Sequence, residues 1–145
     1  MSLIVQKFGG TSVADIERIQ NVADRVAETA DQGNRVVVIL SAMAGVTDTL
    51  IGMAKQINEF PDKRELDVLL STGEQTTAAL LAMMLQSMKY PARSLLGFQA
   101  EVKTDCAFGN ARILGIGANR IKDYLDMNTI VVVAGFQGCL SLIHI

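Results

Sequence analysis

Three uninterrupted apolar runs constrain the fold of this chain more than any other feature. They span residues 3–5, 36–40 and 129–134, the last of which starts with the β-branched Thr129, and consist mainly of valine, isoleucine and leucine. β-Branched residues favour strands, and a run without polar alternation indicates a strand that is buried on both faces. Such strands occur mainly in parallel sheets that carry helices on both faces. We therefore expect an α/β protein with three layers and a mainly parallel sheet.

The segment between the first two runs supports this fold class. Its apolar residues recur every three or four positions from Ile16 to Ala30, which is the period of an amphipathic helix. Ser12 and Asp15 have the spacing of an N-terminal capping box, and Gly33 suits the C-terminal end of the helix. A strand, a helix and a second strand within about 38 residues form a βαβ unit, which should be right-handed.

The rest of the chain continues the alternation of strands and helices. Helical periodicity and turn residues predict helices at 50–57 and from about Gln75 to Met88, a third strand at 91–96, an irregular stretch at 97–110 and a helix over 113–125.

The first strand ends in Lys7-Phe8-Gly9-Gly10-Thr11. Glycines can take positive φ, and their lack of a Cβ lets backbone N–H groups approach an anion closely. A following helix adds the positive end of its dipole, and Lys7 could place an ammonium group beside the same anion. This indicates a phosphate site at the carboxyl edge of the sheet, where open α/β folds bind ligands. Alternatively, the glycine pair only turns the chain and Lys7 is a solvated strand end.

Two further segments have both a structural and a functional interpretation. The second strand runs into small and hydroxyl residues at 41–48, where Thr47 or Asp48 could simply cap the next helix. Ser71 and Glu74 have the spacing of a capping box, so Glu74 could bond to the terminus of its own helix. Alternatively, the Glu74 carboxylate could face the ammonium group of a bound amino acid.

Length and composition exclude several classes of function. The 145 residues fit one globular domain, with 50% hydrophobic and 19% charged residues. A net charge of −2 gives no basic surface for nucleic acid or an anionic membrane. There is no signal-peptide pattern, and no apolar run approaches the roughly 20 residues that span a bilayer. Cys106 and Cys139 match no metal-binding spacing and form no disulfide framework, so a reducing cytoplasm is the expected compartment.

Four motifs resemble, in the same order, those of the aspartate kinases within the amino-acid-kinase superfamily. The first is Lys7-Phe8-Gly9-Gly10-Thr11-Ser12-Val13, and the second is the Ser-Ala-Met-x-Gly-x-Thr loop at residues 41–47. The third is Ser-Thr-Gly-Glu at residues 71–74, and the fourth is Ala-Gly-Phe-Gln-Gly at residues 134–138. The resemblance therefore covers residues 3–138.

This resemblance implies an amino-acid-kinase fold of the carbamate-kinase type. It also implies transfer of the γ-phosphoryl group of ATP, with Mg²⁺, to the side-chain carboxylate of L-aspartate, which begins lysine, threonine and methionine biosynthesis. Lys7 would be catalytic, and Thr47 and Glu74 would bind aspartate. The parent enzyme would be a homo-oligomer, and the resemblance assigns no metal ligand here. The phosphate-binding residues would be Lys7, Phe8, Gly9, Gly10, Thr11 and Ser41.

The resemblance stops before the end of the chain. We expect residues 1–138 to be the N-terminal part of a catalytic domain and residues 139–145 to be a non-native tail. The family's later substrate- and nucleotide-binding segments have no counterpart in these 145 residues. An incomplete parallel sheet would expose apolar edges and faces, and we expect the chain alone to be inactive as a kinase.

Three other functions compete with this interpretation. A sister kinase acting on glutamate, N-acetylglutamate or a nucleotide would share the fold, although the motifs at Thr47 and Glu74 favour aspartate. A non-catalytic module that binds a nucleotide or an amino acid would fit an incomplete active site. A dinucleotide-dependent oxidoreductase fits poorly, since the chain has no GxGxxG sequence after a strand.

Overall fold

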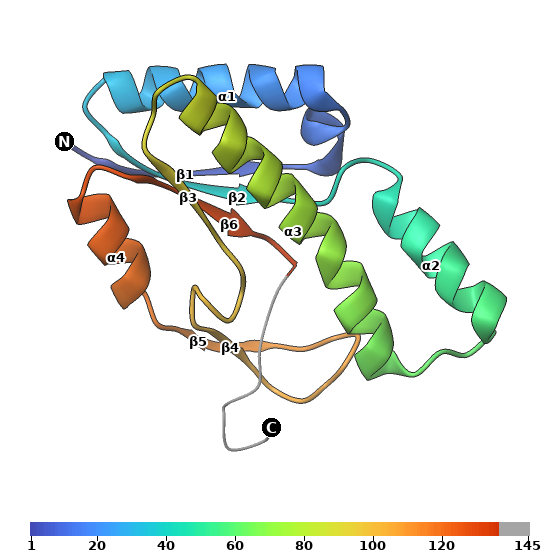
Figure 1. Cartoon of the computed structure of the whole chain (residues 1–145). Coiled ribbons are helices and arrows are strands. Elements are labelled where there is room, and N and C mark those ends of the chain that lie inside the picture. Colours follow the sequence, from blue (N-terminus) through green and yellow to red (C-terminus); the bar gives the residue numbers. More distant parts are fainter. Residues whose placement is uncertain (137–145) are drawn as a thin grey trace.

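The computed structural model describes residues 1–136 and contains a four-stranded parallel sheet between helical layers (Figure 1). All three strand pairings in this sheet are parallel, which confirms the predicted fold class. The strands, in spatial order, are β1 (Leu3–Phe8), β2 (Arg35–Leu40), β6 (Ile130–Ala134) and β3 (Ala92–Leu95).

Helices α1 (Ile16–Asp31) and α3 (Lys63–Ser87) pack on one face of the sheet, and α4 (Asn119–Asp126) packs on the other. The α1/α3 side holds the larger apolar core, in which Ile19, Val38 and Leu81 are fully buried. The α4 side holds a smaller core built around Val37, Val131 and Leu125. These two cores establish the predicted three layers.

The N-terminal end of α1 differs in detail from the prediction. Asp15 is the N-cap itself, because its side chain accepts a hydrogen bond from the backbone N–H of Arg18 at 2.8 Å. Residues Gly10–Val13 form a separate 3₁₀ turn, η1, so Ser12 is not the start of a capping box. Gly33 takes φ +81° just after the helix, as expected for a C-terminal stop.

Helix α3 begins twelve residues earlier than the predicted start at Gln75. Its N-cap is Asp62, which accepts from the backbone N–H of Glu65 at 3.1 Å, and the helix then continues unbroken past Gly73. Ser71 and Glu74 therefore lie in the middle of a helix. The capping-box interpretation of Glu74 was wrong, because an earlier cap was available at Asp62 and no residue between them stops the helix.

The prediction that β1 is buried on both faces was also wrong. β1 is an edge strand, and Leu3 and Val5 are 50% and 58% exposed. Ile4 and Phe8 are half-buried, and Phe8 packs against the core on the α1/α3 side. The reason is that α4 packs against β6 and does not extend across β1.

A small antiparallel hairpin replaces part of two predicted segments. β4 (Val102–Thr104) lies within the stretch expected to be irregular, and β5 (Ile113–Ile116) lies where a helix was expected to begin. Gly115 and Gly117 disfavour a helix here, and the N–H of Gly117 donates to the Glu101 carbonyl at 3.0 Å. The helix begins only at Asn119.

Among residues 1–136, α3 is the one helix that is long and apolar enough to cross a membrane by length and composition. In the structure its apolar face packs against α1 and the sheet, which is the position of a core helix in a globular domain. The buried residues on this face are Thr77, Ala78, Leu81, Ala82 and Leu85.

Candidate active site at the carboxyl edge of the sheet

A cleft of about 460 Å³ lies where β1, β2 and β6 end. Because the strands are parallel, their carboxyl ends meet at this edge, as expected for a ligand site in an α/β fold. Four of the predicted site residues come together here from four separate segments. The lining residues are Lys7, Ile39, Ser41, Thr47, Leu70, Glu74, Gly135 and Phe136.

Lys7 and Glu74 are the two charged side chains in this lining. Lys7 is the penultimate residue of β1 and is exposed. It makes no ion pair within the part of the chain that the structure describes. Its ammonium group is therefore available for an anion at the strand ends.

Glu74 is a buried carboxyl group with one oxygen bonded and one not. The residue is 6% exposed, and its Oε1 accepts a hydrogen bond from the backbone N–H of Ala42 at 3.3 Å. Its Oε2 is also buried and has no hydrogen-bond partner within residues 1–136. Burial raises the pKa of Glu74, while the N–H groups of Glu74 and Ala42 oppose that rise. Such a half-bonded carboxyl group is suited to receiving a cationic ligand group.

Ser41 reaches the cleft from the loop that follows β2, and Thr47 reaches it from the first turn of α2 (Val46–Ile57). The backbone N–H of Ser41 donates to the Phe8 carbonyl at 3.1 Å, which extends the β1–β2 pairing into the loop. Gly45, with φ +81°, is the N-cap of α2, and no side chain caps this helix. The alternative in which Thr47 or Asp48 caps α2 was therefore wrong, and Thr47 instead lines the cleft.

The predicted phosphate residues Phe8, Gly9, Gly10 and Thr11 lie next to the cleft but are not among its lining residues. Within residues 1–136, the glycines with positive φ are Gly33, Gly45 and Gly109, and Gly9 has φ −80° and ψ 171°. The glycine pair therefore does not adopt the positive φ that glycine permits. A Cβ on Gly10 would lie 2.8 Å from the Ala42 carbonyl oxygen, whereas one on Gly9 would meet nothing within 4 Å. The missing side chain of Gly10 thus permits close contact between η1 and the loop that follows β2. The open space around Gly9 leaves its backbone accessible.

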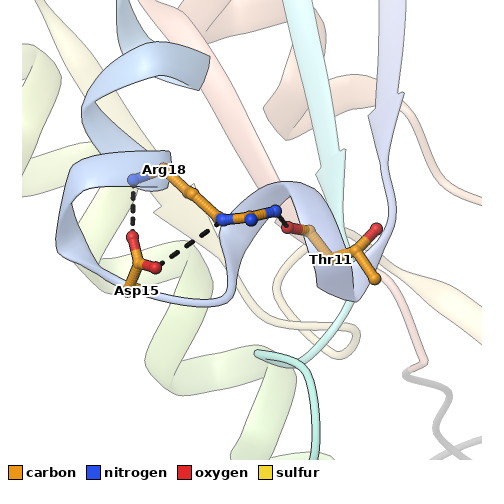
Figure 2. A network of polar contacts seen from close by, with 3 residues as sticks. All are labelled: Thr11, Asp15 and Arg18. Atoms are coloured by element: carbon orange, nitrogen blue, oxygen red, sulfur yellow. Dashed lines mark hydrogen bonds and ion pairs between the residues drawn. The ribbon is translucent and has the colours of Figure 1, made fainter.

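Arg18 bonds to the 3₁₀ turn η1, as Figure 2 shows. Its Nη1 donates to the Thr11 carbonyl at 2.7 Å, and its Nε lies 3.6 Å from the Asp15 carboxylate. Asp15 in turn caps α1. Sequence reasoning missed Arg18, although its position three residues after Asp15 matches the spacing of a helical ion pair.

The described residues contain no group of three or more His, Cys, Asp or Glu side chains that could hold a metal ion. Cys106 is an exposed free thiol. Two of the predicted features, the Gln137-Gly138 end of the fourth motif and the tail at residues 139–145, lie outside the described residues.

Comparisons with known proteins agree with this arrangement. The model of the amino acid kinase family matches residues 2–142. The aspartokinase of Geobacillus stearothermophilus is 58% identical over 138 residues, which are 95% of this chain and 34% of that protein. The chain therefore spans about a third of the length of the curated relatives that it matches.

Solved structures show the same fold. An aspartate kinase from Synechocystis has a TM-score of 0.80 and 48% identity, covering 93% of this chain and 22% of that chain. The structure of E. coli aspartokinase III in complex with aspartate and ADP has a TM-score of 0.77 at 21% identity, covering 90% of this chain and 40% of that chain.

Proposed function

The chain belongs to the amino acid kinase family, and we propose that it is the N-terminal part of the catalytic domain of an aspartate kinase. The observation that carries this proposal is the meeting of Lys7, Ser41, Thr47 and Glu74 in one cleft. One end of such a site offers a cation for phosphate groups, and the other offers a carboxylate for the ammonium group of an amino acid.

In the proposed reaction, an oxygen of the aspartate side-chain carboxylate attacks the γ-phosphorus of ATP. A new O–P bond forms, the bond between the γ-phosphorus and the oxygen that bridges it to the β-phosphate breaks, and ADP leaves with that electron pair. The products are ADP and 4-phospho-L-aspartate. Phosphoryl transfer of this kind depends mainly on alignment and on charge stabilisation.

Lys7 would offset negative charge on the β- and γ-phosphates and on the transferring group. The backbone N–H groups of residues 8–11 would contribute beside it, since Gly9 leaves open space around the backbone. Ser41, at the end of the neighbouring strand, would bond to the phosphate end of the nucleotide. The E. coli aspartokinase III complex with aspartate and ADP, which has this fold, supports ATP as the cosubstrate.

Thr47 and Glu74 would orient aspartate. The buried Oε2 of Glu74 lacks a partner within residues 1–136, and the α-ammonium group of aspartate would supply one. A bound cation favours the ionised carboxylate, so binding should lower the raised pKa of Glu74. Glu74 would therefore select an amino acid over a dicarboxylic acid that lacks the ammonium group.

Mg²⁺ would neutralise phosphate charge in such a reaction. The described residues offer no carboxylate cluster for it. Its ligands would therefore come mainly from the nucleotide phosphates and from water, which is usual for Mg²⁺ at phosphate sites.

We propose that the whole enzyme serves the biosynthesis of lysine, threonine and methionine, is a cytoplasmic homo-oligomer, and binds neither nucleic acid nor membranes. The 145 residues alone should lack kinase activity, because they correspond to about a third of the relatives' length.

A chimeric enzyme tests the substrate. This chain would replace the matching 138 residues of the Geobacillus stearothermophilus aspartokinase, to which they are 58% identical. ADP release would then be measured with L-aspartate, L-glutamate, N-acetylglutamate and UMP as acceptors. Turnover with L-aspartate alone supports the proposal, whereas a preference for another acceptor would indicate a sister kinase of the family.

A further inference from the structure

The end of β2 and the loop that follows it are in close contact with glycines from three other segments. A Cβ on Gly10 would lie 2.8 Å from the Ala42 carbonyl oxygen, and one on Gly135 would lie 2.6 Å from the Leu40 carbonyl oxygen. A Cβ on Gly73 would lie 2.8 Å from the Cβ of Ala42 and 3.4 Å from Cγ1 of Val46. Real Cβ atoms almost never come within 3.0 Å of another atom, and each of these three positions has a neighbour at 2.6–2.8 Å, so none of them has room for a side chain.

The contact at Gly73 differs from the other two because its neighbour in sequence is Glu74. Gly73 packs against the methyl group of Ala42, while Glu74 accepts a hydrogen bond from the N–H of the same Ala42 at 3.3 Å. Both contacts therefore depend on the distance between α3 and Ala42. A side chain at position 73 would push the helix outward and separate the Glu74 carboxyl group from this N–H.

We propose that Gly73 is a positioning residue for Glu74. Its missing side chain lets α3 approach Ala42 closely enough for the Ala42 N–H to hold Oε1, which leaves Oε2 for a cationic group of the ligand. The proposal rests on the proposed function only for the identity of that ligand, the ammonium group of aspartate. Lys7 is the other charged group that lines the cleft.

The chain offers a complementary exchange and a matched control. Gly73→Ala adds a methyl group that collides with Ala42, and Ala42→Gly removes the methyl group with which it collides. In the double variant the nearest remaining atoms are Cγ1 of Val46 at 3.4 Å and Cα of residue 42 at 4.0 Å. Gly52→Ala, in α2, adds the same methyl group where nothing lies within 4 Å.

The first experiment follows the backbone amide of residue 42 by ¹⁵N NMR as pH is varied. In the native chain this amide should shift with the titration of Glu74, whose pKa lies above its ordinary value of 4.5. Gly73→Ala should abolish most of that shift, the double variant should restore it, and Gly52→Ala should leave it unchanged. A full-sized shift in Gly73→Ala, or no shift in the native chain, would overturn the proposal.

If Gly73→Ala prevents folding, the double variant Gly73→Ala with Ala42→Gly tests the proposal instead. A folded double variant whose residue 42 amide titrates with Glu74 supports the proposal, and a double variant that remains unfolded contradicts it. None of these measurements requires aspartate, so their outcome does not depend on whether the proposed function is correct.

Kinetics of the chimeric enzyme provide the second measurement. Loss of one well-formed hydrogen bond to a charged group corresponds to a change of about tenfold in binding. Gly73→Ala should therefore raise KM for L-aspartate about tenfold with little change in KM for ATP, and the double variant should reverse the effect. Equal changes in both KM values, or no reversal, would show a general structural role instead. A chimera that turns over another acceptor would refute the proposed function while leaving the NMR result intact.

Discussion

Glu74, in the middle of α3, accepts a hydrogen bond at 3.3 Å from the backbone N–H of Ala42, which lies 32 residues earlier in the chain. This bond joins the loop between β2 and α2, which carries Ser41 and leads into Thr47 of α2, to the helix that carries the cleft's carboxylate. It occupies only Oε1, and the buried Oε2 has no partner within residues 1–136. A buried carboxylate oxygen without a partner costs stability, and such costs are commonly found at functional sites.

Replacing Glu74 by Gln should stabilise the chain at neutral pH by about 1 kcal/mol. The pKa of Glu74 is raised by burial, so the folded chain binds this proton more tightly than the unfolded chain does. The ionised carboxylate therefore lowers the free energy of unfolding above the folded-state pKa. That penalty disappears as pH falls through the raised pKa towards the ordinary value of 4.5.

Urea unfolding of both proteins at a series of pH values measures this effect. The difference between Glu74→Gln and the native chain should be largest near neutral pH and should shrink as pH falls. A difference that does not change with pH would mean that the Glu74 carboxyl group is not destabilised by burial.

The two adjacent glycines should respond differently to alanine. Gly10→Ala should lower the free energy of unfolding by about 1–3 kcal/mol, because its Cβ would lie 2.8 Å from the Ala42 carbonyl oxygen. Gly9→Ala should leave stability nearly unchanged, since Gly9 has φ −80° and open space around it. Urea unfolding of the two variants compares them directly, and equal losses would contradict the different contacts seen at the two positions.

Val5 and Val37 are neighbours in the β1–β2 register and provide a test of the edge-strand assignment. Val5 is 58% exposed, whereas Val37 is 7% exposed. Val37→Thr should cost about 1–3 kcal/mol because it buries a hydroxyl group, and Val5→Thr should cost less than about 0.5 kcal/mol. Thermal or urea unfolding measures both. A large loss at Val5 would show that another part of the molecule covers this face of β1.

The cap at Asp15 should contribute measurably to α1. Asp15→Ala should cost about 1 kcal/mol, because the backbone N–H of Arg18 loses its acceptor and the guanidinium group loses its ion-pair partner. Asp15→Asn keeps the capping oxygen and should cost less than half as much. Urea unfolding distinguishes the two variants, and an equally large loss in Asp15→Asn would assign the effect to charge and not to the cap.

The elements that could be predicted are those whose structure follows from the pattern of their own residues. The continuous β-branched run of β2 and the period of α1 identified a βαβ unit, and the motifs identified the four polar residues of the cleft. The exposure of β1 could not be predicted, because it depends on how far α4 extends across the other face. The three-residue strand β4 has too little pattern to be recognised among irregular segments.

The internal geometry of the candidate site could not be predicted for a similar reason. The capping spacing of Ser71 and Glu74 is real in the sequence, but the earlier cap at Asp62 decides where the helix begins. The close approach of Gly73 and Gly10 to Ala42 joins residues that are distant in sequence. Such contacts arise from tertiary packing, which local patterns do not encode.

The measurement that tests the central claim most directly is aspartate-dependent ADP release by the chimeric enzyme. We expect turnover with ATP and L-aspartate, and a loss of about 10²–10³-fold in kcat for Lys7→Ala, because in the proposed site Lys7 would stabilise charge on the transferring group. Lys122→Ala, at an exposed position on α4, should match the unmodified chimera. A chimera that folds and binds ATP but releases no ADP with aspartate, or one that is unaffected by Lys7→Ala, would contradict the assignment of this cleft as the active site of an aspartate kinase.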